Sequence, residues 1–142
     1  MLTFVDAGIL ILAARGSADL SARALAVLGD PRRTFVASPF LKLEVLPKPS
    51  YFQRADEVSF YETFFGAVSL WIPASVELVE HAMRVASAYG LACVDALHVA
   101  AALDAHADEL VTAERPTSPL FRVVGLTMLT IMEPAPSAPQ TR

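Results

Sequence analysis

The chain has 142 residues, 54% of them hydrophobic, which is enough for one domain with a sizeable core and leaves no room for a second. Its longest stretch without a charge, residues 63–76, is too short to span a bilayer, and Asp6 within the first apolar run argues against a secretory signal, so we expect a cytoplasmic protein without a membrane segment. A net charge of −4 gives no general attraction to nucleic acid, so a phosphate-binding site would depend on a metal ion and on local cations.

Short apolar runs alternate with segments of helical periodicity along most of the chain. In chain order they predict strand 2–5, a turn at residues 7–8, helix 9–14, helix 18–28, strand 34–37, a helix that begins at Pro39 and is stopped by Pro47 and Pro49, helix 51–65, strand 68–72, helix 75–89, helix 91–105, strand 109–112 and one or two strands within 121–131. This alternation predicts an α/β fold with a mainly parallel central sheet flanked by helices. Residues 133–142 hold three prolines and are expected to form a disordered tail.

Aromatic residues are concentrated in the predicted helix 51–65, at Tyr51, Phe52, Phe60, Tyr61, Phe64 and Phe65. Aromatic side chains can stack on nucleotide bases, but helical aromatics far more often pack. We therefore interpret this helix as core plus a possible interface, and its apolar face is expected to support a homodimer. The single cysteine, Cys93, is expected in the core.

Four acidic residues lie at or near the ends of apolar segments: Asp6, Glu44, Asp95 and Glu114. Ligands collect beyond the carboxyl ends of the strands in a parallel sheet, so we expect these side chains to converge on one pocket. Four carboxylates in one place would repel one another unless a divalent cation neutralises them. Taken singly, Asp95 also suits a helix N-terminus and Glu44 an exposed helical position. Taken together, they predict a site for Mg²⁺ or Mn²⁺, which prefer hard oxygen ligands.

Four segments of the chain resemble a known family: residues 4–8 (Phe-Val-Asp-Ala-Gly), residues 43–45 (Leu-Glu-Val), residues 94–102 (Val-Asp-Ala-Leu-His-Val-Ala-Ala-Ala) and residues 109–114 (Glu-Leu-Val-Thr-Ala-Glu). In this order they are similar to the PIN domain, the fold of many prokaryotic toxin ribonucleases of the VapC type. The third segment is the most specific, because an acid opens an alanine-rich helix that is followed by a strand ending in Thr-x-acid. The resemblance covers almost the whole chain before the tail.

The resemblance implies a three-layer PIN-like fold over residues 1–132. It also implies that Asp6 and Asp95 bind a Mg²⁺ or Mn²⁺ ion and that Glu44 and Glu114 complete the catalytic site. Thr112 is expected either to hydrogen-bond a ligating carboxylate or simply to be a β-branched strand residue. His98 lies one turn from Asp95, and we interpret it as structural because hard-metal phosphodiester chemistry needs no imidazole.

The function implied by the resemblance is that of a metal-dependent endoribonuclease, the toxin of a toxin–antitoxin pair. Its partners would then be an RNA substrate and a cognate antitoxin protein. Two positions depart from the family pattern: Gly8 stands where Ser, Thr or Asn is common, and Glu114 where Asp is common. These departures favour an alternative, a catalytically weak or inactive PIN-like module that binds RNA or protein. A housekeeping RNA-processing nuclease with the same chemistry also stays open.

Overall fold

The computed structural model describes residues 1–132, and the predicted disordered tail, residues 133–142, lies outside the described residues. The strands are β1 (Leu2–Val5), β2 (Thr34–Ala37), β3 (Leu70–Trp71), β4 (Glu109–Thr112) and β5 (Thr127–Thr130). The helices are α1 (Ala7–Arg15), α2 (Ala18–Leu28), α3 (Pro39–Val45), α4 (Pro47–Tyr51), α5 (Ala55–Ala67), α6 (Val76–Tyr89), α7 (Cys93–Asp104) and the 3₁₀ helix η1 (Pro119–Arg122). All strand pairs are parallel, in the order β3-β2-β1-β4-β5, which confirms the predicted α/β fold with a parallel sheet.

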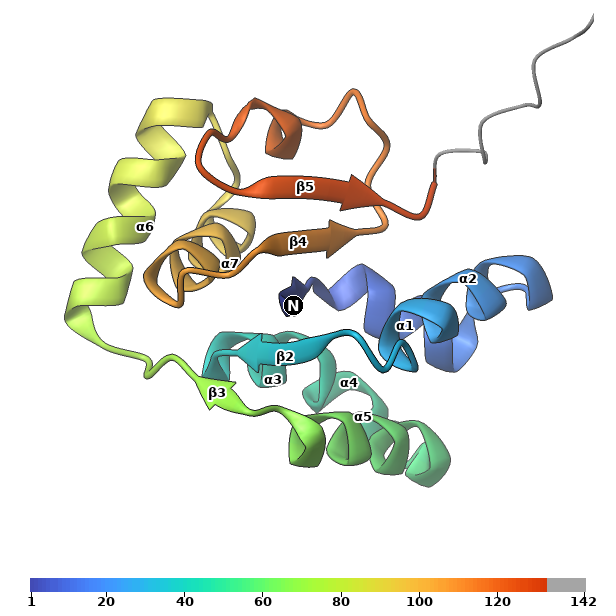
Figure 1. Ribbon diagram of the computed structural model, residues 1–142. Coiled ribbons are helices and arrows are strands. Elements are labelled where there is room, and N and C mark those ends of the chain that lie inside the picture. Colours follow the sequence, from blue (N-terminus) through green and yellow to red (C-terminus); the bar gives the residue numbers. More distant parts are fainter. Residues whose placement is uncertain (133–142) are drawn as a thin grey trace, which may run out of the picture.

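The sheet separates two hydrophobic cores, so the fold has three layers. Successive strand residues face opposite sides: Phe4 packs with α6 and α7, whereas Val5 packs with α1, α2, α3 and α5. β2 and β4 alternate in the same way. Figure 1 shows α6 and α7 on one side of the sheet and α1, α2 and α5 on the other. Both faces are covered by helices, as expected for a parallel sheet whose central strands carry apolar residues on both faces.

Two element boundaries in the first third differ from those predicted. Residues 7–8 are the first turn of α1 and not a separate turn, because Asp6 acts as the N-cap and accepts a hydrogen bond from the Ile9 N–H at 3.3 Å. Pro47 does not stop the helical path but begins a further short helix, α4. Proline is well suited to a first helical turn, where its missing N–H would have had no partner in any case.

The predicted helix 51–65 is divided. Helix α4 ends at Tyr51, Gln53 has a left-handed backbone with φ of 56°, and α5 begins only at Ala55. Within α5, Tyr61, Phe64 and Phe65 are buried in the core, as predicted for the aromatic residues. These three side chains face inward and offer no dimer surface, and the homodimer stays a prediction.

Other differences concern the last third and the cysteine. Phe121 lies in η1 and not in a strand; Gly125, with φ of 85°, then lets the chain turn into β5. The prediction of a buried Cys93 is wrong: the residue is exposed in the first turn of α7, where it lines an open apolar hollow between α6 and α7.

No single helix within residues 1–132 is long and apolar enough to cross a membrane. Taken together, α6 and α7 have the required length and composition, but the chain bends by 112° between them.

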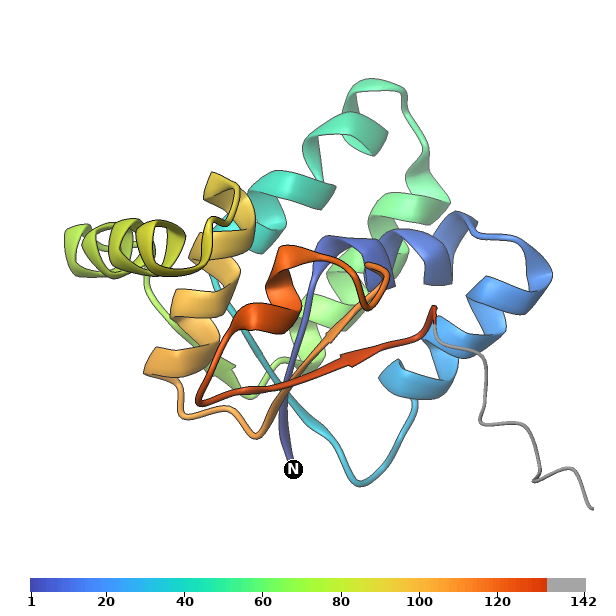
Figure 2. The same ribbon diagram turned by 90° about the horizontal axis from the view of Figure 1, so that it is seen from above.

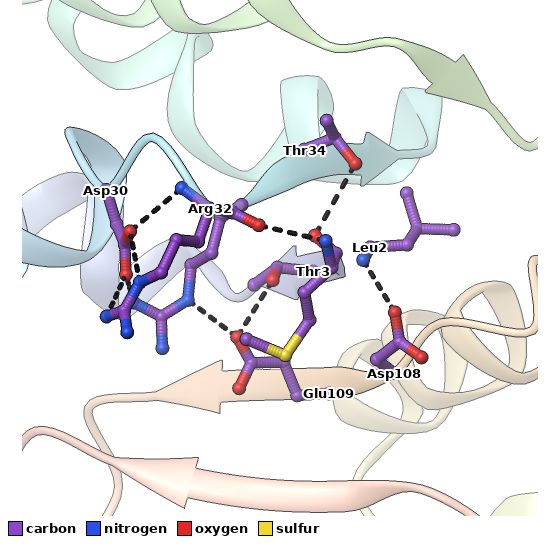
Figure 3. A network of polar contacts seen from close by, with 9 residues as sticks. Leu2, Thr3, Asp30, Arg32, Thr34, Asp108 and Glu109 are labelled. Carbon is purple, nitrogen blue, oxygen red and sulfur yellow. Dashed lines mark hydrogen bonds and ion pairs between the residues drawn. The ribbon is translucent and has the colours of Figure 1, made fainter.

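A polar network joins the amino ends of the strands (Figure 3). The buried carboxylate of Glu109 accepts hydrogen bonds from the Thr3 hydroxyl at 2.8 Å and from the Arg33 guanidinium at 2.6 Å. Arg33 also pairs with Asp30 at 3.0 Å, and Asp108 accepts the backbone N–H of Leu2 at 2.7 Å. The charges at this edge of the sheet thus have partners, and Asp108 lies outside the acidic site, as predicted.

Candidate acidic metal site

The structure places the four predicted acids on four different elements around the carboxyl ends of the central strands. Asp6 directly follows β1, Glu114 follows β4 by two residues, Glu44 lies on α3 and Asp95 lies in the first turn of α7. Figure 2 shows β1 leading from the N-terminus towards the edge where α1, α3 and the beginning of α7 meet. Their charges also influence one another. The charges of Glu114 and Glu44 raise the pKa of Asp95, and the charge of Asp95 raises the pKa of Asp6. The expected convergence on one edge is therefore present.

Asp6 is the most buried of the four acids. One carboxylate oxygen accepts the Ile9 N–H, and the other accepts the hydroxyl of Thr112 at 2.5 Å. The Thr112 oxygen in turn accepts the Glu114 backbone N–H at 3.0 Å, so a short chain of hydrogen bonds runs from the end of β4 to Asp6. Burial nevertheless raises the pKa of Asp6 to about 6, and the hydrogen bonds from Thr112 and Ile9 offset only part of this effect.

Glu44 is held by a residue that was expected to be structural only. His98 is almost completely buried on α7, and its Nε2 lies 2.7 Å from a carboxylate oxygen of Glu44. The other ring nitrogen, Nδ1, is buried without a hydrogen-bond partner among residues 1–132. We therefore assign the proton to Nε2, because this tautomer leaves no buried N–H unpaired. His98 thus restrains the Glu44 carboxylate and connects α7 to α3.

Asp95 and Glu114 are less restrained. Within residues 1–132 neither carboxylate makes a hydrogen bond, and Asp95 is half-buried while Glu114 is exposed. Burial and then the nearby negative charges of Glu114 and Glu44 raise the pKa of Asp95. A cation that bound here would relieve both the desolvation and the repulsion.

The donor chemistry of the site fits a hard divalent cation, since all four side chains are carboxylates. The carboxylates are not gathered for one in advance: within the described part of the chain, no three His, Cys, Asp or Glu side chains are arranged to hold an ion. Two of them are instead engaged by Thr112 and His98. Binding would therefore require side-chain rotations that draw Asp95 and Glu114 towards Asp6.

The departure at Gly8 has a structural cause. A Cβ atom at this position would lie 2.9 Å from the Cβ of Ala113 and 3.3 Å from a carboxylate oxygen of Asp6. Real Cβ atoms do not approach that closely, so α1 and the segment after β4 pack together only because residue 8 lacks a side chain. The polar group common at this position in the resembled family has no space here.

No protein-family model matches the chain, and no curated protein sequence matches it. Solved structures do match. VapBC2 from Rickettsia felis, bound to a DNA fragment from its promoter, has a chain with a TM-score of 0.68 at 14% identity, covering 92% of this chain and 98% of that one. A chain of a toxin–antitoxin complex from Klebsiella pneumoniae has a TM-score of 0.65 at 19% identity, and the match covers 88% of this chain and 95% of that one. A chain of DNA-bound VapBC from Salmonella typhimurium has a TM-score of 0.61 at 12% identity, and the match covers 92% of this chain and 98% of that one.

The chain has a PIN-like fold. This confirms the three-layer architecture predicted from the resemblance, and identities below 20% mean that the likeness concerns the fold. In the PIN-like fold of this chain, Asp6 and Glu114 follow strands and Glu44 and Asp95 lie on helices, as the sequence predicted. The contact between His98 and Glu44 was not predicted, because these residues are 54 positions apart and no local pattern connects them.

Proposed function

We propose that the chain is a metal-dependent endoribonuclease that hydrolyses phosphodiester bonds in RNA and acts in the cytoplasm as the toxin of a toxin–antitoxin system. The observation that carries this proposal is the group of four carboxylates at the carboxyl edge of a PIN-like fold, two of which have raised pKa values. Clustered carboxylates that are incompletely neutralised destabilise a fold, and such groups are concentrated at functional sites.

Asp6 and Asp95 would hold a Mg²⁺ or Mn²⁺ ion, with Glu44 and Glu114 ligating through water or orienting the attacking water. The ion, when bound, would supply positive charge for the scissile phosphate and lower the pKa of a bound water. The protein's own contribution is orientation: Thr112 fixes the rotamer of Asp6, and His98 fixes that of Glu44. The side chain of Glu114 is longer than that of the Asp that is common at this position and makes no hydrogen bond within the described residues, so it would be free to turn towards the ion.

A protein partner is the second part of the proposal. The matching solved structures include a toxin–antitoxin complex, which supports a cognate antitoxin for this chain. A segment of that antitoxin would cover the acidic edge, with an Arg side chain placed among the carboxylates. We also retain a homodimer as a proposal, without assigning its surface.

The test is cleavage of a mixed RNA pool by the purified chain in Mg²⁺ or Mn²⁺. Asp6→Asn and Asp95→Asn should each reduce the cleavage rate by at least about 100-fold, because each removes charge from the proposed metal site. Asp19→Asn is the matched control, since Asp19 lies exposed on α2 and, within residues 1–132, forms an ion pair only with Arg23. Cleavage that persists in EDTA or in both site variants would contradict the proposal.

One observation favours the alternative of a non-catalytic RNA- or protein-binding module, namely that the carboxylates are not arranged in advance around an ion position. A folded chain that binds RNA and cleaves none of it in Mn²⁺ would support this alternative. A housekeeping nuclease would show the same cleavage as a toxin. Growth arrest on expression, relieved by a protein encoded next to it, distinguishes the toxin from the housekeeping enzyme.

A further inference from the structure

The turn between α4 and α5 presents two aromatic rings to solvent. The chain contains eight Phe, three Tyr and one Trp, and of these only Tyr51 (80% exposed) and Phe52 (54% exposed) are exposed. Their rings meet edge to face, with centroids 5.0 Å apart and an interplanar angle of 83°. Tyr51 is the most exposed of the large apolar side chains in residues 1–132. The other aromatic residues are at least partly buried, so this pair requires a separate explanation.

Backbone hydrogen bonds hold the two rings on a defined support. The N–H groups of Phe52, Gln53 and Arg54 donate to the carbonyls of Lys48, Ser50 and Pro49 at 3.1, 3.2 and 2.8 Å, respectively. Gln53 adopts a left-handed backbone, which ends α4 abruptly and redirects the chain into α5. The rings therefore project from a turn that three backbone hydrogen bonds hold in place.

Positive charge accompanies the rings. Between Glu44 and Asp56 the sequence contains Lys48 and Arg54 and no acidic residue, in a chain with a net charge of −4. The Arg54 guanidinium lies over the Phe52 ring, 5.0 Å from its centroid, and its Nη1 also lies 3.6 Å from a carboxylate oxygen of Glu57, whereas Lys48 is exposed. Other basic residues are used elsewhere: Arg33, for example, is bound to Glu109 at the opposite edge of the sheet.

The rings also lie on the side of the molecule that carries the acids. α4 directly follows α3, the helix of Glu44, and the two helices pack together. Figure 2 shows α4 and the turn after it projecting beyond α3 from the edge at which the strands end. A polymer bound across the acids would extend over this turn.

We propose that Tyr51 and Phe52 form a base-stacking step that binds single-stranded RNA beside the acidic site, with Lys48 and Arg54 contacting its phosphates. This inference rests on the proposed nuclease function and specifies where its substrate is held. Stacking on exposed rings tolerates any base, because every base has a π-face, and nearby cations track the backbone. RNA is favoured over a protein partner because the hollows beside the turn have charged and polar walls, whereas the centre of a protein interface is depleted of charge. The charged and polar residues are Arg15, Gln53, Arg54, Asp56 and Glu57, and Lys48 is the exposed cation available to a phosphate.

The test measures binding of a short fluorescein-labelled single-stranded RNA of mixed sequence, by anisotropy, to the full chain in EDTA so that cleavage does not interfere. The double substitution Tyr51→Leu and Phe52→Leu keeps apolar bulk but removes both rings, and it should weaken binding by at least about tenfold. The matched variant Tyr51→Phe and Phe52→Tyr keeps both rings and should bind as the wild type does. Lys48→Gln should reduce the slope of log affinity against log salt by about 0.7.

The outcomes separate this inference from the proposed function. Equal RNA affinity in the wild type and the leucine variant overturns the stacking step, whether or not the wild type cleaves RNA in Mn²⁺. Ring-dependent binding without any cleavage in Mn²⁺ supports the stacking step and overturns the nuclease proposal. If sedimentation shows instead that the leucine variant loses a dimer while its RNA affinity is unchanged, the rings contact a second copy of the chain and the inference is wrong.

Discussion

Asp6 meets two conflicting requirements, because it is nearly completely buried and is also the carboxylate on which the proposed metal site depends. Burial disfavours its charged form, and the hydrogen bonds from Ile9 and Thr112 do not restore an ordinary pKa. In the absence of a cation, the folded protein therefore keeps Asp6 protonated below a pH of about 6, and above it the fold carries the energetic penalty of a buried negative charge.

The sign of the expected pH effect follows from these pKa values. Between about pH 4 and pH 6 the folded state binds more protons at Asp6 than the unfolded state does, so stability falls as pH rises through this window. The rise in the pKa of Asp6 from 3.8 to about 6 corresponds to a loss of at most about 3 kcal/mol in the free energy of unfolding. An asparagine at this position would lose one of the two hydrogen bonds that Asp6 accepts, which costs about 1 kcal/mol.

We therefore predict that Asp6→Asn stabilises the protein in EDTA by about 1–2 kcal/mol at about pH 7.5 and loses this advantage at about pH 4. Urea unfolding of both proteins at the two pH values measures the difference. Asp19→Asn again serves as control, and a difference for Asp6→Asn that does not change with pH would show that its charge is not the cause.

Single residues differed in how well they could be predicted. The positions of Asp6 and Thr112 could be predicted because the apolar runs mark the ends of β1 and β4 clearly. A hydrogen bond from Thr112 to a carboxylate was one of two interpretations of that residue, the other being a β-branched strand residue. The contact between His98 and Glu44 depends on how α3 and α7 approach each other across the sheet, a tertiary fact without a local signal. Cys93 was placed wrongly because residue type alone suggests burial, whereas the first turn of α7 borders an open hollow.

At the scale of elements, two glycines show how position determines the effect of the same substitution. Gly90 ends α6 with a left-handed φ of 68°, and a Cβ there would lie 3.2 Å from the Arg122 guanidinium. Gly66 lies within α5 and has no atom within 4 Å of the place a Cβ would occupy. The first site needs glycine for its backbone, and the second does not.

Accordingly, Gly90→Ala should destabilise the protein by about 1–2 kcal/mol, since L-residues adopt the left-handed region at that cost. Gly66→Ala should stabilise it by about 0.5–1 kcal/mol, because alanine favours helix and narrows the unfolded ensemble. Chemical denaturation of the two variants beside the wild type checks both values. Destabilisation by both substitutions to the same extent would contradict this assignment of roles.

Most element positions were predictable because their signals are local and strong. Strands β1, β2 and β4 were predicted with the observed bounds, since β-branched and aromatic residues lie between clear stops. α4 was missed because proline is compatible with both the end of one helix and the first turn of the next, and only the tertiary course of the chain distinguishes them. The same ambiguity hid the turn that exposes Tyr51 and Phe52.

At the scale of the whole molecule, the two edges of the sheet have opposite electrostatic character. At the amino edge, Glu109 is buried with Arg33 and Thr3 as partners. At the carboxyl edge, Asp6 and Asp95 have raised pKa values. One edge is thus neutralised by the protein itself, while the other retains negative charge that a bound cation could balance.

A divalent cation should therefore stabilise the whole fold. A Mn²⁺ concentration about 100 times its Kd should add about 2.7 kcal/mol to the free energy of unfolding. For a domain of this size, that corresponds to a rise in Tm on the order of 10 °C. The rise should be smaller at about pH 5, where protons compete for Asp6, and should be lost in Asp95→Asn. Differential scanning calorimetry with and without Mn²⁺ gives the result, and an equal rise in Asp95→Asn would place the ion elsewhere.

The contact between residues 8 and 113 constrains the order in which this sequence can change. A Cβ added at Gly8 would clash with the Cβ of Ala113, so a serine at position 8 fits without a backbone shift only after position 113 has become glycine. In the reverse order, α1 or the segment after β4 has to shift to relieve the contact. The two positions are therefore epistatic, and a hydroxyl gained beside Asp6 at position 8 is accommodated best once the opposite wall has lost the methyl group of Ala113.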